Sequence, residues 1–459
     1  MSELKAISWR RFALYALSLP RGPNFDPLHE VSWWSDDRGS AAGLVTFNPV
    51  AGTFGCQGMR RDVDHCFRVF PALEGLASEQ KALEQLRRVM RCGDPPEPRP
   101  RGLPARPNPF HLVEGRTVNE KFTLLRESWN HRPALHAAGE VYFALDRPDE
   151  NFVGDFQTEG FEARLWELYL FAAFREQAIE VHQDSPSPDF RLVNDDRSVF
   201  VEAATANAEQ RLQPAFVSHA PPPEDRAERF IGEAAARFAK SLRSKMAKRY
   251  WELPHVSGHP FVLAIADFHK SGSMIWTLNA LQSYLYGILV ESAVENGEKR
   301  AWSVPVARLI DKHSIPAGFF NQPDGEHVSA VIGCNAATLG KFNRMGHLAD
   351  YRMPGLRMER SGLLFNHDGN RLEPIEFRYD IDDPLYEKLW PWGEVWCLEM
   401  EVYHNPKALH PIPRNFFPGA THFFERDGEI VFEGPWKNRV LGSVTALLPK
   451  GPPRPSAPE

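Results

Sequence analysis

The sequence predicts an α/β protein in which helices cover a mixed β-sheet, with a β-containing region before this core and an α+β region after it. Three observations predict this class. The chain has 459 residues, of which 42% are hydrophobic, so it can bury a sizeable core. Helix-like and strand-like segments follow one another in the order helix, three strands, helix, strand. Proline-rich tracts mark off the flanking regions from this centre.

Composition divides the chain into four regions. Residues 1–115 hold a β-hairpin and a helix and end in a tract rich in proline and arginine. We expect this tract to be an exposed linker, because proline interrupts both helices and central strands. Residues 116–295 form the α/β core, and residues 296–448 form the C-terminal α+β extension. Residues 449–459 are again rich in proline and are expected to be a disordered tail.

The core begins with a helix at residues 158–175, a segment rich in leucine and alanine. Three strands are predicted next, at residues 178–183, 189–194 and 198–205. The four residues between the last two strands read "NDDR", which is the asparagine and aspartate chemistry of a tight hairpin turn. The second and third strands should therefore pair antiparallel.

A second long helix is predicted at residues 226–253, followed by a strand at 259–268 and a buried helix at 274–290. Between residues 225 and 250 there are eight Lys or Arg and three Asp or Glu, a net charge of +5 in a chain whose formal net charge is −7. A solvated helix face is the ordinary explanation for such charge. Because the whole chain is acidic, any nucleic acid would have to bind a local basic surface.

Composition also argues against several functional classes. No run approaches the roughly 20 apolar residues of a membrane span, and no signal peptide is evident, so we expect a cytoplasmic protein without a membrane partner. The five cysteines lie far apart, with neither a CxxC pair nor an HExxH motif, which argues against the usual zinc sites and predicts reduced thiols. Nucleotide-binding glycine loops and the GxSxG motif of serine hydrolases are missing from the sequence.

Four carboxylates stand out in the core. Asp189 opens the second strand, and Glu202 lies in the third strand, on the same face as Ala204. The first helix carries Glu162 and Glu167 in a largely apolar surface. A buried carboxylate needs a cation, a metal ion or hydrogen bonds, because an isolated buried charge is costly. Pairing with the arginines of the same helix at positions 164 and 175 is as good an explanation for these two glutamates as metal binding.

The order of elements, the "PD" that opens the second strand and the acid after 12 intervening residues together resemble the PD-(D/E)XK nuclease superfamily. The resemblance covers about residues 157–289 and implies a restriction-endonuclease-like fold that hydrolyses phosphodiester bonds with Mg²⁺ or Mn²⁺. It implies that Asp189 and Glu202 are the metal ligands on the strands. Glu167 would be a third ligand, directly or through water, and is preferred to Glu162 because of its distance from the first strand.

The third motif departs from the family pattern. Where the family carries Glu-x-Lys, Glu202 is followed by two alanines, and Thr205 points to the opposite face of the strand. Some members of the superfamily take the basic residue from the following helix, which here offers Lys245 and Lys248. These lysines are three residues apart and can share a helix face. By this resemblance either lysine could place its ammonium group beside the metal.

The predicted function is therefore that of a metal-dependent nuclease that acts on nucleic acid, with DNA as the favoured substrate. The missing lysine keeps an alternative open, in which a catalytically inactive protein of the same fold binds nucleic acid or a protein partner. A third interpretation treats the core as an interaction scaffold whose acids are surface charges. Convergence of the carboxylates of Asp189, Glu202 and Glu167 would separate the first two interpretations from the third.

Overall fold

The structure is a computed structural model that describes residues 4–19, 29–91, 106–207, 221–295, 298–367 and 373–450. Within these ranges the protein is a mixed α/β molecule with several sheets. Most of the predicted linker tract and nearly all of the predicted tail lie outside the described residues.

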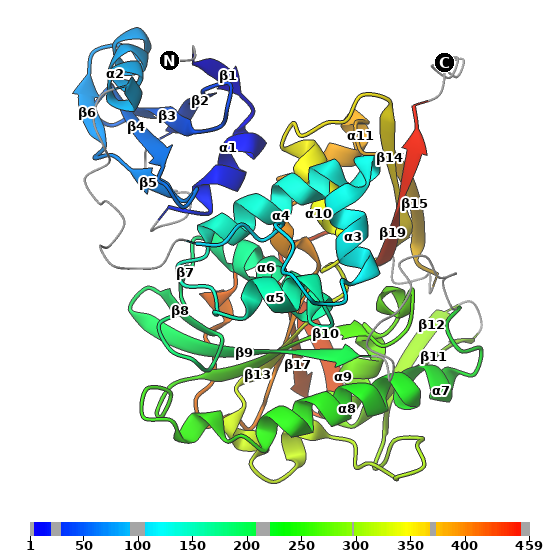
Figure 1. Ribbon diagram of the computed structural model, residues 1–459. Helices are drawn as coiled ribbons and strands as arrows, with labels where there is room; N and C mark the ends of the chain where they lie inside the picture. The colour runs from blue at the N-terminus through cyan, green and yellow to red at the C-terminus, as the bar shows by residue number, and fades with distance from the viewer. Residues whose placement is uncertain are drawn as a thin grey trace.

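The N-terminal region forms a six-stranded antiparallel sheet with a helix on each face (Figure 1). Its helices are α1 (Trp9–Ala16) and α2 (Glu79–Arg91). One hydrophobic cluster lies between the sheet and α1 and a second lies under α2, so both faces of this sheet are covered. The strands are β1 (Lys5–Ile7), β2 (His29–Ser35), β3 (Ala41–Asn48), β4 (Thr53–Arg61), β5 (Phe67–Val69) and β6 (Leu73–Leu76).

The main sheet has eight described strands in the order β18-β17-β16-β13-β10-β9-β8-β7. The strands β9, β10 and β13 are parallel to one another, while β8 runs antiparallel to both β7 and β9. Their bounds are β7 (Glu180–His182), β8 (Phe190–Asn194), β9 (Arg197–Asn207), β10 (Phe261–Phe268), β13 (Ala330–Cys334), β16 (Met400–His404), β17 (Thr421–Arg426) and β18 (Glu429–Glu433). The sheet therefore takes strands from both sides of the predicted boundary at residue 295.

Helices cover both faces of this sheet (Figure 1). The helix α6 packs on β9 from one side, in a layer with its neighbours, and α8 packs on β9 and β10 from the other side, next to α9. The first layer contains α3 (Glu120–Glu127), α4 (Arg132–Ala144), α5 (Phe152–Gln157) and α6 (Phe161–Glu176). The second contains α7 (Arg226–Ile231), α8 (Glu233–Met246) and α9 (Leu278–Tyr286).

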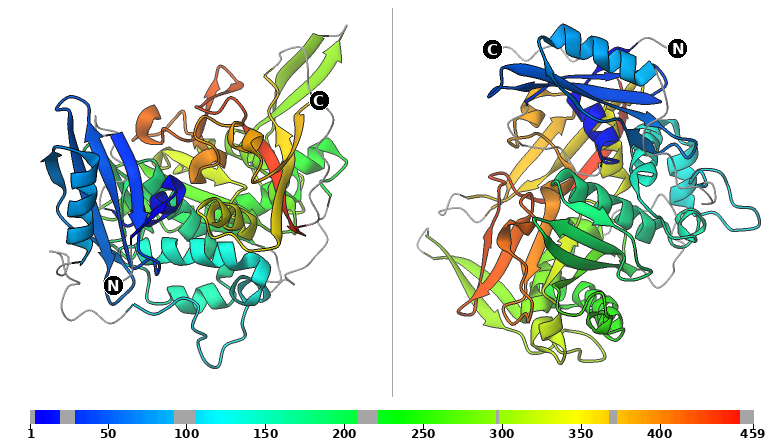
Figure 2. Two further views of the ribbon diagram at one scale, coloured as in Figure 1. Left: turned by 90° about the horizontal axis from the view of Figure 1, so that it is seen from above. Right: turned by 90° about the vertical axis from the view of Figure 1, so that its left-hand side faces the viewer.

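The remaining elements extend the main body. A two-stranded ribbon projects from it (Figure 2), and a three-stranded sheet lies near α10. The ribbon is β11 (Ile288–Glu295) and β12 (Glu298–Pro305); the small sheet is β14 (Leu356–Leu364), β15 (Ile375–Asp380) and β19 (Val440–Pro449). The further helices are α10 (Leu339–Leu348) and α11 (Pro384–Glu387), with short 3-10 turns at η1 (Trp129–His131), η2 (Tyr250–Glu252), η3 (Ser273–Ile275), η4 (Phe319–Asn321), η5 (Gly325–His327), η6 (Trp396–Glu399) and η7 (Arg414–Phe416).

Two predicted helices are shorter than expected: the first is divided at a glycine and ends at Met246, and the second ends at a glycine. The predicted helix 226–253 is divided at Gly232, where the backbone is not helical and a side chain would lie about 2.3 Å from Glu228. The predicted helix 274–290 ends at Gly287, which adopts the left-handed conformation (φ +67°) that favours glycine. The residues after Gly287 belong to strand β11 instead.

The predicted alternation in β9 is confirmed. Val199, Val201 and Ala203 pack in the hydrophobic cluster on the α6 side of the sheet. Phe200 and Ala204 pack in the cluster on the α8 side. Glu202 lies between these last two residues in sequence and therefore faces α8.

Candidate functional site

The hairpin β8–β9 brings Asp189 and Glu202 next to each other. A two-residue turn joins the strands, and both of its aspartates have positive φ (47° and 62°), as a tight hairpin turn requires. This turn sets a register in which Phe190 pairs with Val201, so Asp189 comes opposite Glu202. The carboxylate oxygen Oδ2 of Asp189 accepts a hydrogen bond from the backbone N–H of Ala203 at 2.7 Å, which fixes its position at the strand.

Glu202 is almost fully buried, with only 4% of its surface exposed, and is held from the α8 side. Its Oε1 accepts hydrogen bonds from the ammonium group of Lys245 at 2.5 Å and from the hydroxyl group of Tyr250 at 2.6 Å. Its other oxygen, Oε2, is buried and has no hydrogen-bond partner among the described residues. One oxygen of this carboxylate is therefore committed, and the other is available to a ligand.

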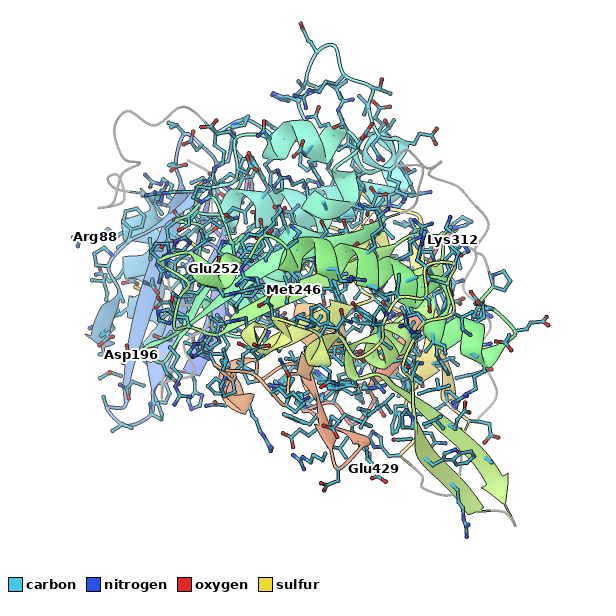
Figure 3. All side chains as sticks on the ribbon, turned by 90° about the horizontal axis from the view of Figure 1, so that it is seen from below. Arg88, Asp196, Met246, Glu252, Lys312 and Glu429 are labelled. Carbon is cyan, nitrogen blue, oxygen red and sulfur yellow. The ribbon has the colours of Figure 1, made fainter. Side chains whose placement is uncertain are left out.

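The structure distinguishes between the two lysines that the sequence nominated. Lys245 lies in the last turn of α8 and reaches Glu202 across the face of the sheet. Lys248 is exposed, and its ammonium group lies 5.7 Å from the centre of the Tyr250 ring. Figure 3 marks Met246, the residue after Lys245, close to Glu252 in η2. Only Lys245 forms an ion pair with Glu202 within the described structure.

Tyr250 is a site residue that sequence reasoning missed. The helical run after α8 ends at Arg249, which adopts a left-handed conformation (φ +50°) and starts the turn η2. After this change of direction, the Tyr250 hydroxyl group is buried against Glu202. The segment "SKMAKRYW" holds an aromatic residue directly after the basic run, which was the available signal. The reversal at Arg249 could not be predicted from that run, because an arginine rarely adopts positive φ.

Glu167 is held by an arginine. Arg164 contacts both carboxylate oxygens of Glu167, at 3.0 and 3.1 Å, and also pairs with Asp155 at 2.7 Å and Asp149 at 2.9 Å. This is the pairing within the helix that the sequence left open as an alternative. Glu167 nevertheless lies close enough to Asp189 for the two negative charges to interact.

Glu162 lies on another face of α6. Its carboxylate pairs with the ammonium group of Lys121 at 2.7 Å. Five residues separate it from Glu167, which places the two side chains about 140° apart around the helix axis. The structure thus places Glu167 near Asp189 and gives Glu162 a partner of its own.

The electrostatics of the site reflect its burial. Burial and the negative charge of Glu202 raise the pKa of Asp189 from 3.8 to about 6, although the Ala203 amide and Lys245 act in the opposite direction. Burial and the charge of Asp189 raise the pKa of Glu167 to about 8, against the effect of Arg164. In both groups burial is the larger cause, because it disfavours the ionised carboxylate, and repulsion from the neighbouring acid adds to it.

The described residues contain no group of three or more His, Cys, Asp or Glu side chains that is placed to hold a metal ion. A magnesium ion needs less than this from the protein, because one or two carboxylates usually bind it together with water and substrate phosphate. Asp189 and Glu202 supply two such carboxylates, with the free Oε2 of Glu202 among their oxygens. These two carboxylates therefore fit Mg²⁺ or Mn²⁺. Glu162 is not part of this donor set, because it pairs with Lys121, and Glu167 is held by Arg164.

We compared the chain with protein-family models, with curated proteins and with solved structures, and found no match. Function must therefore be inferred from the side chains that the fold brings together. The helices in the described ranges are all too short or too polar to cross a membrane.

Proposed function

We propose that the protein is a metal-dependent nuclease that hydrolyses phosphodiester bonds of nucleic acid, preferably DNA, at a variant PD-(D/E)XK site. One observation carries this proposal: the ammonium group of Lys245 lies 2.5 Å from Glu202. The carboxylate of Glu202, whose strand lacks the lysine of the Glu-x-Lys motif, is thus paired with an amine from the following helix. The element order α6, β7, β8, β9, α7, α8, β10, with β9 and β10 parallel, supports a restriction-endonuclease-like core.

In this proposal Asp189 and Glu202 would hold Mg²⁺ or Mn²⁺. When bound, the cation would neutralise charge on the phosphate and make a bound water acidic enough to lose a proton near neutral pH. Lys245 places a positive charge where negative charge develops on the phosphate, which is the role that the missing lysine would otherwise have. Tyr250 fixes the Glu202 carboxylate through its hydrogen bond, and Arg164 keeps Glu167 in place behind Asp189.

A catalytically inactive protein of the same fold, which binds nucleic acid or a protein partner, is the second candidate. The ion pairs favour it, because Lys245 already neutralises Glu202 and Arg164 already neutralises Glu167. In such a protein these residues would stabilise the fold and leave no place for a metal ion. The two candidates make opposite predictions about metal binding.

Divalent-metal-dependent cleavage tests the proposal. Wild type and Asp189→Asn would be incubated with supercoiled, linear and single-stranded DNA and with RNA, in Mg²⁺, Mn²⁺ or EDTA. We expect cutting that requires metal and disappears in Asp189→Asn. If no substrate is cut and neither metal raises the melting temperature, the inactive protein is the better account.

A lysine transfer tests the role of Lys245 more sharply. Ala204 lies two residues after Glu202 on the same face of β9, at the position of the missing lysine. We expect Lys245→Ala to lower the cleavage rate about 100-fold or more, the usual effect of removing one group that stabilises transition-state charge. The double variant Ala204→Lys, Lys245→Ala should recover at least part of this loss. A double variant as well folded as wild type but no more active than Lys245→Ala would argue against an interchangeable amine.

A further inference from the structure

The helix that carries Lys245 is unusually basic for this chain. Residues 234–249 contain six Lys or Arg and no Asp or Glu, whereas the whole chain has a formal net charge of −7. Three of the six form ion pairs, namely Arg237 with Glu233, Lys245 with Glu202, and Arg249 with Glu252 and Asp324. The other three, Lys240, Arg243 and Lys248, are exposed and form no ion pair within the described residues.

These three residues form one stripe on the outer side of α8 and the turn after it. Lys240 and Arg243 are three residues apart and share one face of α8, and Lys248 lies in the turn just beyond the end of the helix at Met246. The residues between them on this face, Ser244 and Ala247, are small and exposed, so nothing bulky interrupts the stripe. In Figure 3 the molecule is seen from the side on which α8 lies outermost. We call Lys240, Arg243 and Lys248 the basic stripe.

The dimensions of the basic stripe suit a phosphate backbone. Lys240 and Arg243 are three residues apart on the helix, a rise of about 4.5 Å, and one strand of B-form DNA places a phosphate about every 3.4 Å along its axis. These two cations can therefore contact neighbouring phosphates of one strand, and Lys248 extends the basic surface beyond the end of the helix. Unpaired cations in an acidic chain are also where a polyanion would be held, because the rest of the surface repels it.

The stripe and the candidate site share an element. Lys245 lies between Arg243 and Lys248 in the chain, but it points inward to Glu202. A strand that follows the outer side of α8 toward Lys248 would thus reach the end of the helix that faces Asp189 and Glu202.

We propose that the basic stripe binds the phosphate backbone of a nucleic-acid strand and leads it to the site at Asp189 and Glu202. This inference rests on the proposed function for the class of ligand, but it concerns binding and not cleavage.

Fluorescence anisotropy with labelled 24-nucleotide single-stranded DNA, duplex DNA and RNA tests the inference, between 50 and 300 mM NaCl. Every protein would carry Asp189→Asn and the buffer would contain EDTA, so that no substrate is cut. The test variant is Lys240→Gln, Arg243→Gln. The matched control is Lys81→Gln, Arg88→Gln, which removes two exposed cations from α2 in the N-terminal region; Figure 3 marks Arg88 far from Met246.

Each lost phosphate contact lowers the slope of log K against log salt by about 0.7 to 0.9. By the same relation, we expect the magnitude of this slope to be smaller by about 1.4 to 1.8 in the test variant. We expect the variant to bind about 25- to 60-fold more weakly at 0.1 M salt. The control should differ little from its parent. No binding by the parent protein, or equal losses of affinity in the test and control variants, would overturn the proposal that the basic stripe binds nucleic acid. Binding that depends on the stripe, together with a wild-type protein that cuts no substrate in Mg²⁺ or Mn²⁺, would keep this inference and reject the nuclease.

Discussion

Asp189→Asn should make the protein more stable at neutral pH. Burial and the charge of Glu202 raise the pKa of Asp189 from 3.8 to about 6, so the ionised form destabilises the folded state. The shift is roughly 2 pKa units, and each unit corresponds to about 1.4 kcal/mol, which gives a gain of about 3 kcal/mol at pH 7.5. Asparagine removes the charge, and its amide oxygen can still accept the hydrogen bond from Ala203.

The pH dependence gives this prediction its sign. Above pH 6 the folded wild type carries an unfavourable charge that the variant lacks, so the full difference is present. As the pH falls from 6 to about 4, Asp189 takes up its proton more readily in the folded state than in the unfolded state, and wild type gains stability. Below about pH 4 the carboxyl group is protonated in both states, and the two proteins should be equally stable.

Urea denaturation in EDTA at pH 7.5, 5 and 4 measures the difference. Asp196→Asn is the matched control, because Asp196 is exposed in the β8–β9 turn, where its positive φ also suits asparagine. A less stable Asp189→Asn at pH 7.5, or a difference that does not change with pH, would refute the reasoning.

Mg²⁺ at 100 times its dissociation constant would stabilise wild type by about 2.7 kcal/mol. Because the variant loses a ligand, the metal should close most of the gap.

Further predictions concern other charges. Lys245→Met should lower the cleavage rate about 100-fold or more, whereas Lys248→Met should retain nearly wild-type cleavage at saturating substrate, because only Lys245 reaches the buried carboxylate. Burial lowers the pKa of His404 from 6.5 to about 3, and its Nε2 lies 2.8 Å from Nδ1 of His422. Between pH 7 and 5 the protonation of His404 should therefore contribute a loss of about 2 kcal/mol, measured as the change in the difference between wild type and His404→Gln in urea denaturation. Glu394 is fully buried among three cations, so Glu394→Gln should lower the free energy of unfolding by about 3 to 5 kcal/mol.

Local sequence signals predicted the elements of the core well. The turn "NDDR" and the alternation in residues 198–205 correctly placed the β8–β9 hairpin, because its register depends on neighbouring residues. The helix breaks at Gly232 and Gly287 carried a visible signal that was not used. The strand that pairs with β10 on the side away from β9 could not be predicted from the sequence. The strand β13 starts 62 residues after the end of β10, and such pairings depend on packing of the whole chain.

The residues of the candidate site also divide into those that local sequence predicts and those whose contacts depend on packing between distant parts of the chain. Asp189 and Glu202 were predicted together because the hairpin alone brings them together. The choice between two lysines needed the packing of α8 on β9, across 43 residues of sequence. The pairing of Glu167 with Arg164 is local, at a separation of three residues, but the sequence could not say whether a metal ion or the arginine would hold the carboxylate.

The alanine at position 204 and the lysine at position 245 are two parts of one arrangement. Ala204 is 6% exposed and packs against α8 in the cluster that includes Phe238 and Leu242. A lysine at 204 would bring a second ammonium group beside Glu202, where Lys245 already pairs with the carboxylate. The second ammonium group would then occupy Oε2, the oxygen of Glu202 that has no partner among the described residues and that the proposed metal ion would need. The fold can hold the amine on the strand or on the helix, but not on both. An alanine at the motif position is therefore what the proposed site, with its lysine on α8, requires, and by itself it does not argue against the proposal.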